Sequence, residues 1–205
     1  VLLVFGDSLT AGYGVAARDT FPAQLSRALH QRGFDVTVRN AGVSGDTTAG
    51  GRARLDWSVS EPGIRAAIVE LGANDALRGL SPEDAERNLD AILDAFQERG
   101  VKVLLAGMLA PPNMGSAYFD RFAKIYPRLA GRYGVPLYPF FLDGVASVPA
   151  LNQADGMHPN AQGYAVVVQR IMPMVVKLLE SAGIAPVLAA GRAVSDGNDS
   201  SPLKR

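Results

Sequence analysis

Short hydrophobic runs alternate with polar or amphipathic segments along most of the chain. The runs are rich in Val, Ile, Leu and Phe, and Gly, Pro or Asn residues close each of them. Runs of this length and composition are typical of strands that are buried on both faces. The pattern predicts five strands, at residues 1–5, 36–38 leading into 40–42, 66–71, 101–108 and 136–141.

The segments between these runs have the hydrophobic period of helices. Residues 20–33 place apolar side chains at spacings of four, and residues 81–100 begin with a Ser-Pro pair and two acids, as helix starts often do. Residues 117–132 and 160–181 are predicted to form two more helices. Alternating strands and helices indicate an α/β fold, so we expect a three-layer sandwich in which helices cover both faces of a mainly parallel, five-stranded sheet.

Polar clusters follow the first three predicted strands. They are Gly6-Asp7-Ser8, residues 42–46 and residues 72–75, and a fourth cluster at residues 155–160 precedes the last helix. The carboxyl ends of parallel strands lie at one edge of the sheet, where ligands gather. Each cluster alone has an ordinary explanation as a turn or a helix cap. Together they predict a functional site at this edge.

The four clusters supply every group that hydrolysis of an ester requires. Ser8 is the candidate nucleophile, His158 the base, and Asp155 the carboxylate that orients the imidazole. The backbone N–H groups of Ser8 and Gly45 and the side-chain amide of Asn74 are candidate donors to the oxyanion. Each role is filled once.

With these residues in place, the chain resembles the SGNH or GDSL hydrolases. The four blocks of that superfamily occur in order as "GDSL" with Ser8, "NAGVSGDT" with Gly45, "LGAND" with Asn74, and "DGMHPN" with Asp155 and His158. Within the superfamily the chain resembles the bacterial thioesterase I, arylesterase and lysophospholipase group, over about residues 1–181. The resemblance implies a flavodoxin-like sandwich and a serine hydrolase for carboxylic esters and thioesters, such as aryl or alkyl esters, acyl-CoA or lysophospholipids. It implies no metal and no cofactor.

Candidate substrate contacts follow the fourth predicted strand. Met108, Leu109, Met114, Tyr118 and Phe119 lie near the active edge and suit an acyl or aryl group, although they also suit a core or a helix start. Asp7 is a further candidate contact, but capping or bracing the turn before Ser8 is the preferred role for its carboxylate.

Two other functions remain open at this point. A carbohydrate-deacetylating esterase of the same superfamily is expected to have more polar and aromatic side chains near its site, and this chain has a single Trp. A flavodoxin-like module could bind a phosphate or nucleotide with residues 6–14, but this leaves Asn74 and the Asp155–His158 pair unexplained. Gly-x-Gly-x-x-Gly does not follow the first strand, and the chain has no Cys and only two His, which argues against a dinucleotide or zinc site.

Composition sets the remaining expectations. The chain has 205 residues, which is long enough for one domain with a sizeable core. Residues 1–185 are predicted to form one hydrolase domain, and residues 186–205 are predicted to form a flexible C-terminal tail. Twenty basic and twenty acidic residues cancel, which predicts no nucleic acid as partner. The resemblance implies a small-molecule ester or thioester instead. No apolar run approaches the ~18 residues of a membrane helix.

The first residue of the chain bears on its location. Because the chain does not start with Met, one expectation is a periplasmic or secreted protein whose N-terminal export signal has been removed. The other expectation is a cytoplasmic protein. The oligomeric state is not predicted.

Overall fold

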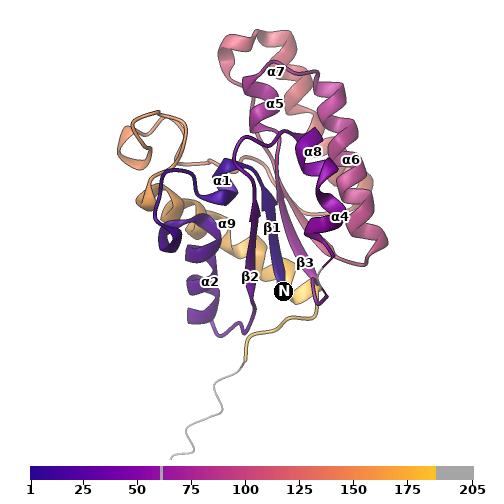
Figure 1. Ribbon diagram of the computed structural model, residues 1–205, viewed down its shortest axis with the longest axis vertical. Helices are drawn as coiled ribbons and strands as arrows, with labels where there is room; N and C mark the ends of the chain where they lie inside the picture. The colour runs from indigo at the N-terminus through magenta and orange to yellow at the C-terminus, as the bar shows by residue number, and fades with distance from the viewer. Residues whose placement is uncertain (61, 188–205) are drawn as a thin grey trace, which may run out of the picture.

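A five-stranded parallel sheet forms the centre of the computed structural model, which describes residues 1–60 and 62–187 (Figure 1). The strand order in this part of the chain is β2-β1-β3-β4-β5. Because the order reverses between β1 and β3, the carboxyl ends of these two strands flank the position where parallel α/β sheets bind ligands. The strands are β1 (Leu2–Gly6), β2 (Val38–Gly42), β3 (Ala66–Glu70), β4 (Lys102–Ala106) and β5 (Leu137–Tyr138).

Helices cover both faces of the sheet, which confirms the predicted sandwich. On one face α2 (Phe21–Gln31) packs against α9 (Ala161–Ser181). On the other face α6 (Pro82–Glu98) contacts both α3 (Thr48–Ala53) and α8 (Ile125–Tyr133). Figure 1 shows α6 and α8 on the side of the sheet away from α2 and α9. The shorter helices are α1 (Ser8–Ala11), α4 (Leu55–Ser58), α5 (Ala73–Leu77) and α7 (Ser116–Ala123).

The core explains why the central strands are hydrophobic throughout. Every residue of β1 and of β3 is buried, because helices cover these strands on both faces. The apolar stripe of α6 (Leu89, Ile92, Leu93 and Phe96) is buried as well. Burying a side chain of this size stabilises a fold by about 1.5–3 kcal/mol, so the two helix layers fix the sheet and its carboxyl edge.

Two predicted elements differ from the structure because of prolines. The single helix expected at residues 117–132 is two helices, α7 and α8, that meet at Lys124. Pro127 lies in the first turn of α8, where a missing N–H costs nothing, whereas it would interrupt one continuous helix. The strand expected at residues 136–141 ends at Tyr138, because Pro139 cannot donate to the sheet.

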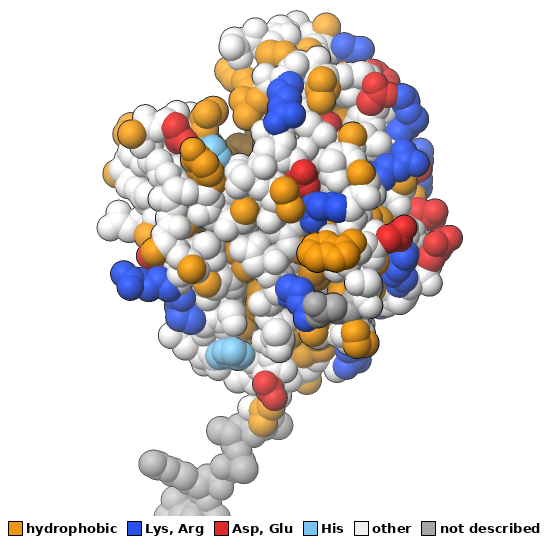
Figure 2. Space-filling model, viewed as in Figure 1, with side chains coloured by type: hydrophobic (Ala, Val, Ile, Leu, Met, Phe, Trp, Pro, Cys, Tyr) orange, Lys and Arg blue, Asp and Glu red, His pale blue; other side chains and the backbone are white. Residues whose placement is uncertain are grey.

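The remaining expectations concern the ends and the surface of the chain. No helix in the described ranges combines the length and the hydrophobicity that a membrane crossing requires. Of the predicted tail, only Pro186 and Val187 belong to the described residues, and the Val187 N–H donates a hydrogen bond to the Gly33 carbonyl (2.8 Å). Figure 2 shows that hydrophobic side chains gather around a hollow in the upper part of one face.

Candidate active site

The polar clusters meet at the carboxyl edge of the sheet, as the sequence predicts. Gly6 at the end of β1 is in register with Gly42 of β2 on one side and with Glu70 of β3 on the other. The chain therefore leaves all three strands at the same level. The loop that precedes α9 brings the fourth cluster to this edge.

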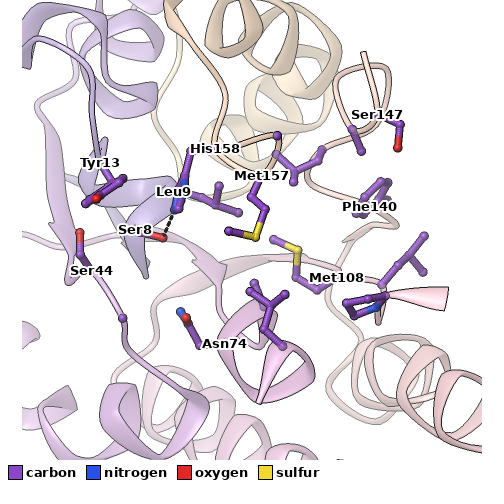
Figure 3. A pocket seen from close by; sticks show the side chains of 18 residues that line it. Ser8, Leu9, Tyr13, Ser44, Asn74, Met108, Phe140, Ser147, Met157 and His158 are labelled. Atoms are coloured by element: carbon purple, nitrogen blue, oxygen red, sulfur yellow. Dashed lines mark hydrogen bonds between the residues drawn. The ribbon is translucent and has the colours of Figure 1, made fainter. Parts of the chain in front are cut away.

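Ser8, His158 and Asp155 form a continuous hydrogen-bonded chain. Ser8 Oγ lies 2.9 Å from His158 Nε2, although 150 residues separate the two in the sequence. His158 Nδ1 lies 2.6 Å from Asp155 Oδ2. The His158 and Asp155 side chains are 18% and 31% exposed. Figure 3 shows the serine and the histidine facing each other at one end of a pocket.

The carboxylate of Asp155 is held in its ionised form by the backbone. Its Oδ1 accepts hydrogen bonds from the N–H groups of Met157 (2.9 Å) and His158 (3.0 Å). These backbone bonds, together with the contact to the imidazole, lower the pKa of Asp155 to about 2. The carboxylate is thus charged at neutral pH, and it can stabilise the imidazolium.

Asp7 braces the turn that carries Ser8. Its Oδ1 accepts the N–H of Leu9 (2.9 Å) and caps α1, and its Oδ2 accepts from Asn74 Nδ2 (3.2 Å). The bracing role is confirmed. The side chain is fully buried and does not line the pocket, so the structure places it out of reach of a substrate. Burial raises the pKa of Asp7 to about 7.

A second buried acid lies beneath the same turn. Glu70 is fully buried, and its Oε2 accepts a hydrogen bond from Thr10 Oγ1 (2.8 Å). A Cβ on Gly6 would lie 2.1 Å from that hydroxyl oxygen and 2.6 Å from Glu70 Oε2. Only glycine fits there, which explains the first residue of the "GDSL" block. Burial raises the pKa of Glu70 well above its ordinary value.

The three candidate oxyanion donors surround the mouth of the site. Gly45 has a φ of +86°, and no acceptor in the described residues takes its N–H or that of Ser8. Asn74 Nδ2 donates to the Asp46 carbonyl (2.9 Å) as well as to Asp7 (3.2 Å), so both amide hydrogens already have acceptors, and donation to an oxyanion requires one of these bonds to open. Ser8, Gly45 and Asn74 all line the same pocket. Their role as a set of oxyanion donors stays a prediction.

A pocket of about 490 Å³ extends from Ser8. Figure 3 shows Leu9, Met157, Met108 and Phe140 at increasing distance from Ser8 along one side of the pocket. Tyr13 and Ser44 lie on the other side of Ser8. The wall is mostly apolar, which suits a hydrocarbon or aryl group. It is lined by Ser8, Leu9, Tyr13, Ser44, Gly45, Ala73, Asn74, Leu77, Met108, Leu109, Pro111, Phe140, Leu142, Ala146, Ser147, Gly156, Met157 and His158.

Two of the candidate contacts after β4 reach this wall and three do not. Met108 and Leu109 line the pocket, but Met114, Tyr118 and Phe119 lie outside it. The Tyr118 hydroxyl instead donates to the Leu80 carbonyl (2.8 Å). The reason is local: after Pro111 the chain turns away into α7, which packs beside α6 and α8.

Sequence reasoning gave no role to several residues of the pocket. Met157 lies inside the "DGMHPN" block, and Phe140 follows β5 at the carboxyl edge, so their positions in the sequence were available signals. Tyr13 is different, because its ring approaches the His158 ring (4.8 Å between centroids) only through the tertiary fold. In residues 1–60 and 62–187 no three His, Asp or Glu side chains gather in a way that would hold a metal ion.

Comparison with known proteins decides the family. A family model described as GDSL-like lipase/acylhydrolase matches residues 4–166, which include all four polar clusters. The chain belongs to the GDSL-like lipase/acylhydrolase family. It is therefore a hydrolase of carboxylic esters, and its matched region ends inside α9.

Several curated relatives are similar to this GDSL-like hydrolase over most of their length. The esterase TesA of Pseudomonas aeruginosa is 39% identical, over 87% of this chain and 89% of its own. An arylesterase of Vibrio mimicus has the same identity and the same coverage. Thioesterase 1/protease 1/lysophospholipase L1 of Escherichia coli is 41% identical, over 78% of this chain and 75% of its own.

Solved structures of GDSL-like hydrolases agree with the fold. AlinE4, described as an SGNH-hydrolase family esterase, is 48% identical and has a TM-score of 0.74, over 87% of this chain and 95% of its own. The psychrotrophic esterase EstA from Pseudoalteromonas, in a structure inhibited by monoethylphosphonate, is 28% identical and has a TM-score of 0.83. The match covers 87% of this chain and 98% of EstA. The flavodoxin-like sandwich is thus the SGNH hydrolase fold.

Proposed function

We propose that this hydrolase cleaves esters and thioesters through an acyl-enzyme on Ser8. The observation that carries the proposal is the chain of hydrogen bonds from Ser8 Oγ through His158 to Asp155, at one end of an apolar pocket. A serine hydroxyl is a weak nucleophile, and a neutral imidazole within hydrogen-bond distance activates it.

The reaction has two halves. His158 Nε2 takes the proton of Ser8 as Oγ bonds to the carbonyl carbon, and it returns this proton to the leaving alcohol or thiol. Water then attacks the acyl-enzyme, gives its proton to His158, and the carboxylic acid leaves as Ser8 Oγ recovers a proton. The N–H groups of Ser8 and Gly45 and the amide of Asn74 stabilise the oxyanion in both halves.

The pocket supports an apolar acyl group as the substrate class. Its wall beyond Ser8 offers methionine, leucine and phenylalanine side chains, and methionine adapts to chains of different shape. Each buried methylene contributes about 0.8 kcal/mol, so kcat/KM should rise about threefold to fourfold per added carbon until the pocket is filled. Thioesters fit the same chemistry, and one relative carries the name thioesterase.

A panel of p-nitrophenyl esters with increasing acyl length tests this proposal, set beside acyl-CoA thioesters and acetylated sugars. We expect kcat/KM to rise from acetyl to medium chains and acyl-CoA to be cleaved. Higher activity on acetylated sugars than on every acyl ester would favour carbohydrate deacetylation instead. Ser8→Ala should lose activity by on the order of 10⁶ in kcat, whereas His30→Gln, far from the site, should retain it.

The location of the protein stays a prediction. An exported enzyme is expected to appear in the periplasmic or extracellular fraction when its complete gene is expressed. Fractionation of cells, with esterase activity as the readout, decides between this and a cytoplasmic enzyme.

A further inference from the structure

Gln153 joins the two segments of the chain that carry the nucleophile and the base. One is the nucleophile segment, residues 7–14, and the other is the histidine loop, residues 152–160. The side-chain Nε2 of Gln153 donates to the Tyr13 carbonyl (2.8 Å) and to the Pro159 carbonyl (2.9 Å). One amide thus uses both of its hydrogens, and its bond to Tyr13 spans 140 positions of the sequence.

The backbone of Gln153 also holds the loop around His158. The Gln153 N–H donates to the His158 carbonyl (2.8 Å), and the Gln153 carbonyl accepts from the Gly156 N–H (2.9 Å). Tyr13, on the other side, donates its own N–H to the Ser8 carbonyl (3.1 Å). The path from the histidine to the serine therefore consists of three consecutive hydrogen bonds.

The chain makes room for this amide at Gly14. A Cβ on that residue would lie 2.0 Å from Gln153 Oε1, and the φ of Gly14 is +75°. The conformation favours glycine, and a larger residue there would displace the Gln153 amide. The contact between the two segments is part of the fold and not a chance meeting of surface side chains.

Other hydrogen bonds fix the ends of the histidine loop but do not reach the nucleophile segment. Asn152 Nδ2 donates to the carbonyls of Val145 and Val148, and Asn160 Nδ2 donates to the Ala150 carbonyl. Between residues 7–14 and residues 152–160, which are all described, there are two direct hydrogen bonds. One is Ser8–His158 and the other is Gln153–Tyr13.

The first of these two bonds is lost during the reaction. When Ser8 carries the acyl group, its Oγ has no proton to donate, and yet His158 must stay in place to activate water. We propose that Gln153 is a positioning residue for deacylation, because its bond to Tyr13 keeps the histidine loop aligned with the acylated serine. The proposal rests on the proposed roles of Ser8 and His158.

The ratio of acylated to unacylated enzyme at saturating substrate tests this role. It equals the ratio of the acylation rate to the deacylation rate, and intact-protein mass spectrometry of quenched p-nitrophenyl ester reactions measures it. In acylation the hydrogen bond from Ser8 itself keeps His158 aligned. Gln153→Ala should therefore slow deacylation more than it slows acylation. We expect the ratio to rise about five- to tenfold, as for one lost hydrogen bond, with kcat and KM falling together.

A control variant and a second substitution of Gln153 separate this effect from a loss of structure. Gln162→Ala removes an exposed glutamine of α9 and should leave the ratio unchanged. Gln153→Glu, which lacks the amide hydrogens, should behave like Gln153→Ala.

An unchanged or lower ratio in Gln153→Ala would overturn the proposal, whether or not its melting temperature falls. Failure of the proposed function has a different signature. If Ser8 is not the nucleophile, the wild-type protein forms no acyl adduct on the peptide that contains Ser8. The two failures are therefore distinguishable in one series of measurements.

Discussion

Two aspartates near Ser8 are held in opposite electrostatic states. Backbone N–H groups keep the pKa of Asp155 at about 2, while burial raises the pKa of Asp7 to about 7. The first arrangement supplies a permanent negative charge for the imidazole, and the second supplies a bracing group that is neutral in mild acid. Residue type alone does not distinguish these roles, since the difference arises from solvent and from backbone donors.

Asp155→Asn tests the charge behind the histidine. Loss of the carboxylate should lower kcat by on the order of 10³–10⁴, because the asparagine stabilises the imidazolium poorly. The low-pH limb of kcat/KM should move to lower pH for the same reason. His30→Gln serves as the control for the second histidine, and an unchanged profile in Asp155→Asn would remove this aspartate from the triad.

Asn74→Ala tests the side-chain donor to the oxyanion. An interaction made mainly in the transition state should reduce kcat by roughly 10²–10³ with little change in KM. Because Asn74 also bonds to Asp7 and to the Asp46 carbonyl, the melting temperature must be measured in parallel. A variant that melts earlier but keeps its kcat would make Asn74 a structural residue of the turn.

At the scale of elements, the ends of β1 and β3 form one buried unit with the first turn of α1. The predicted strands placed Ser8 and Asn74 correctly at the carboxyl edge, because hydrophobic runs that end in polar clusters locate strand ends. The support beneath them was not predictable. Thr10 meets Glu70 only because β1 and β3 pair in one particular register, with Gly6 opposite Glu70.

Asp7→Asn tests the energetics of this unit. The folded protein keeps the Asp7 proton up to a pKa of about 7, whereas the unfolded chain releases it near 3.8. The free energy of unfolding should therefore fall as pH rises between these two values. Asparagine cannot ionise, so the fall should be smaller in the variant. Thermal melts of both proteins across this range measure it, and parallel curves would contradict the raised pKa.

At the scale of the whole molecule, the reversal of strand order next to β1 brings the four clusters together. The alternation of runs predicted this sandwich, and the family comparison agrees with it. Sequence patterns did not reveal that Tyr13 and Gln153 connect the two ends of the domain. Such contacts depend on how the last loop returns over the first helix, and local periodicity carries no information about it.

Truncation tests the predicted boundary of the hydrolase domain. Residues 188–205 lie outside the described residues, and their composition predicts that they are dispensable for chemistry. A chain that ends after Val187 should match the full chain in kcat/KM. A chain that ends after Ala185 should differ only in melting temperature, by a few degrees at most, because it loses the bond to Gly33. A lower kcat/KM in either protein would show that the tail takes part in the active site.

Covalent labelling by a phosphonate monoester is the most direct test of the central claim, that Ser8 is the nucleophile of an ester hydrolase. The reagent is a p-nitrophenyl ester: Ser8 Oγ gives its proton to His158, bonds to phosphorus and displaces p-nitrophenolate, and the adduct mimics the tetrahedral intermediate. We expect intact-mass analysis to show one added phosphonyl group, tandem mass spectrometry to place it on Ser8, and Ser8→Ala to remain unlabelled. A phosphonyl group on any other residue, or full activity in a protein labelled at Ser8, would contradict the account.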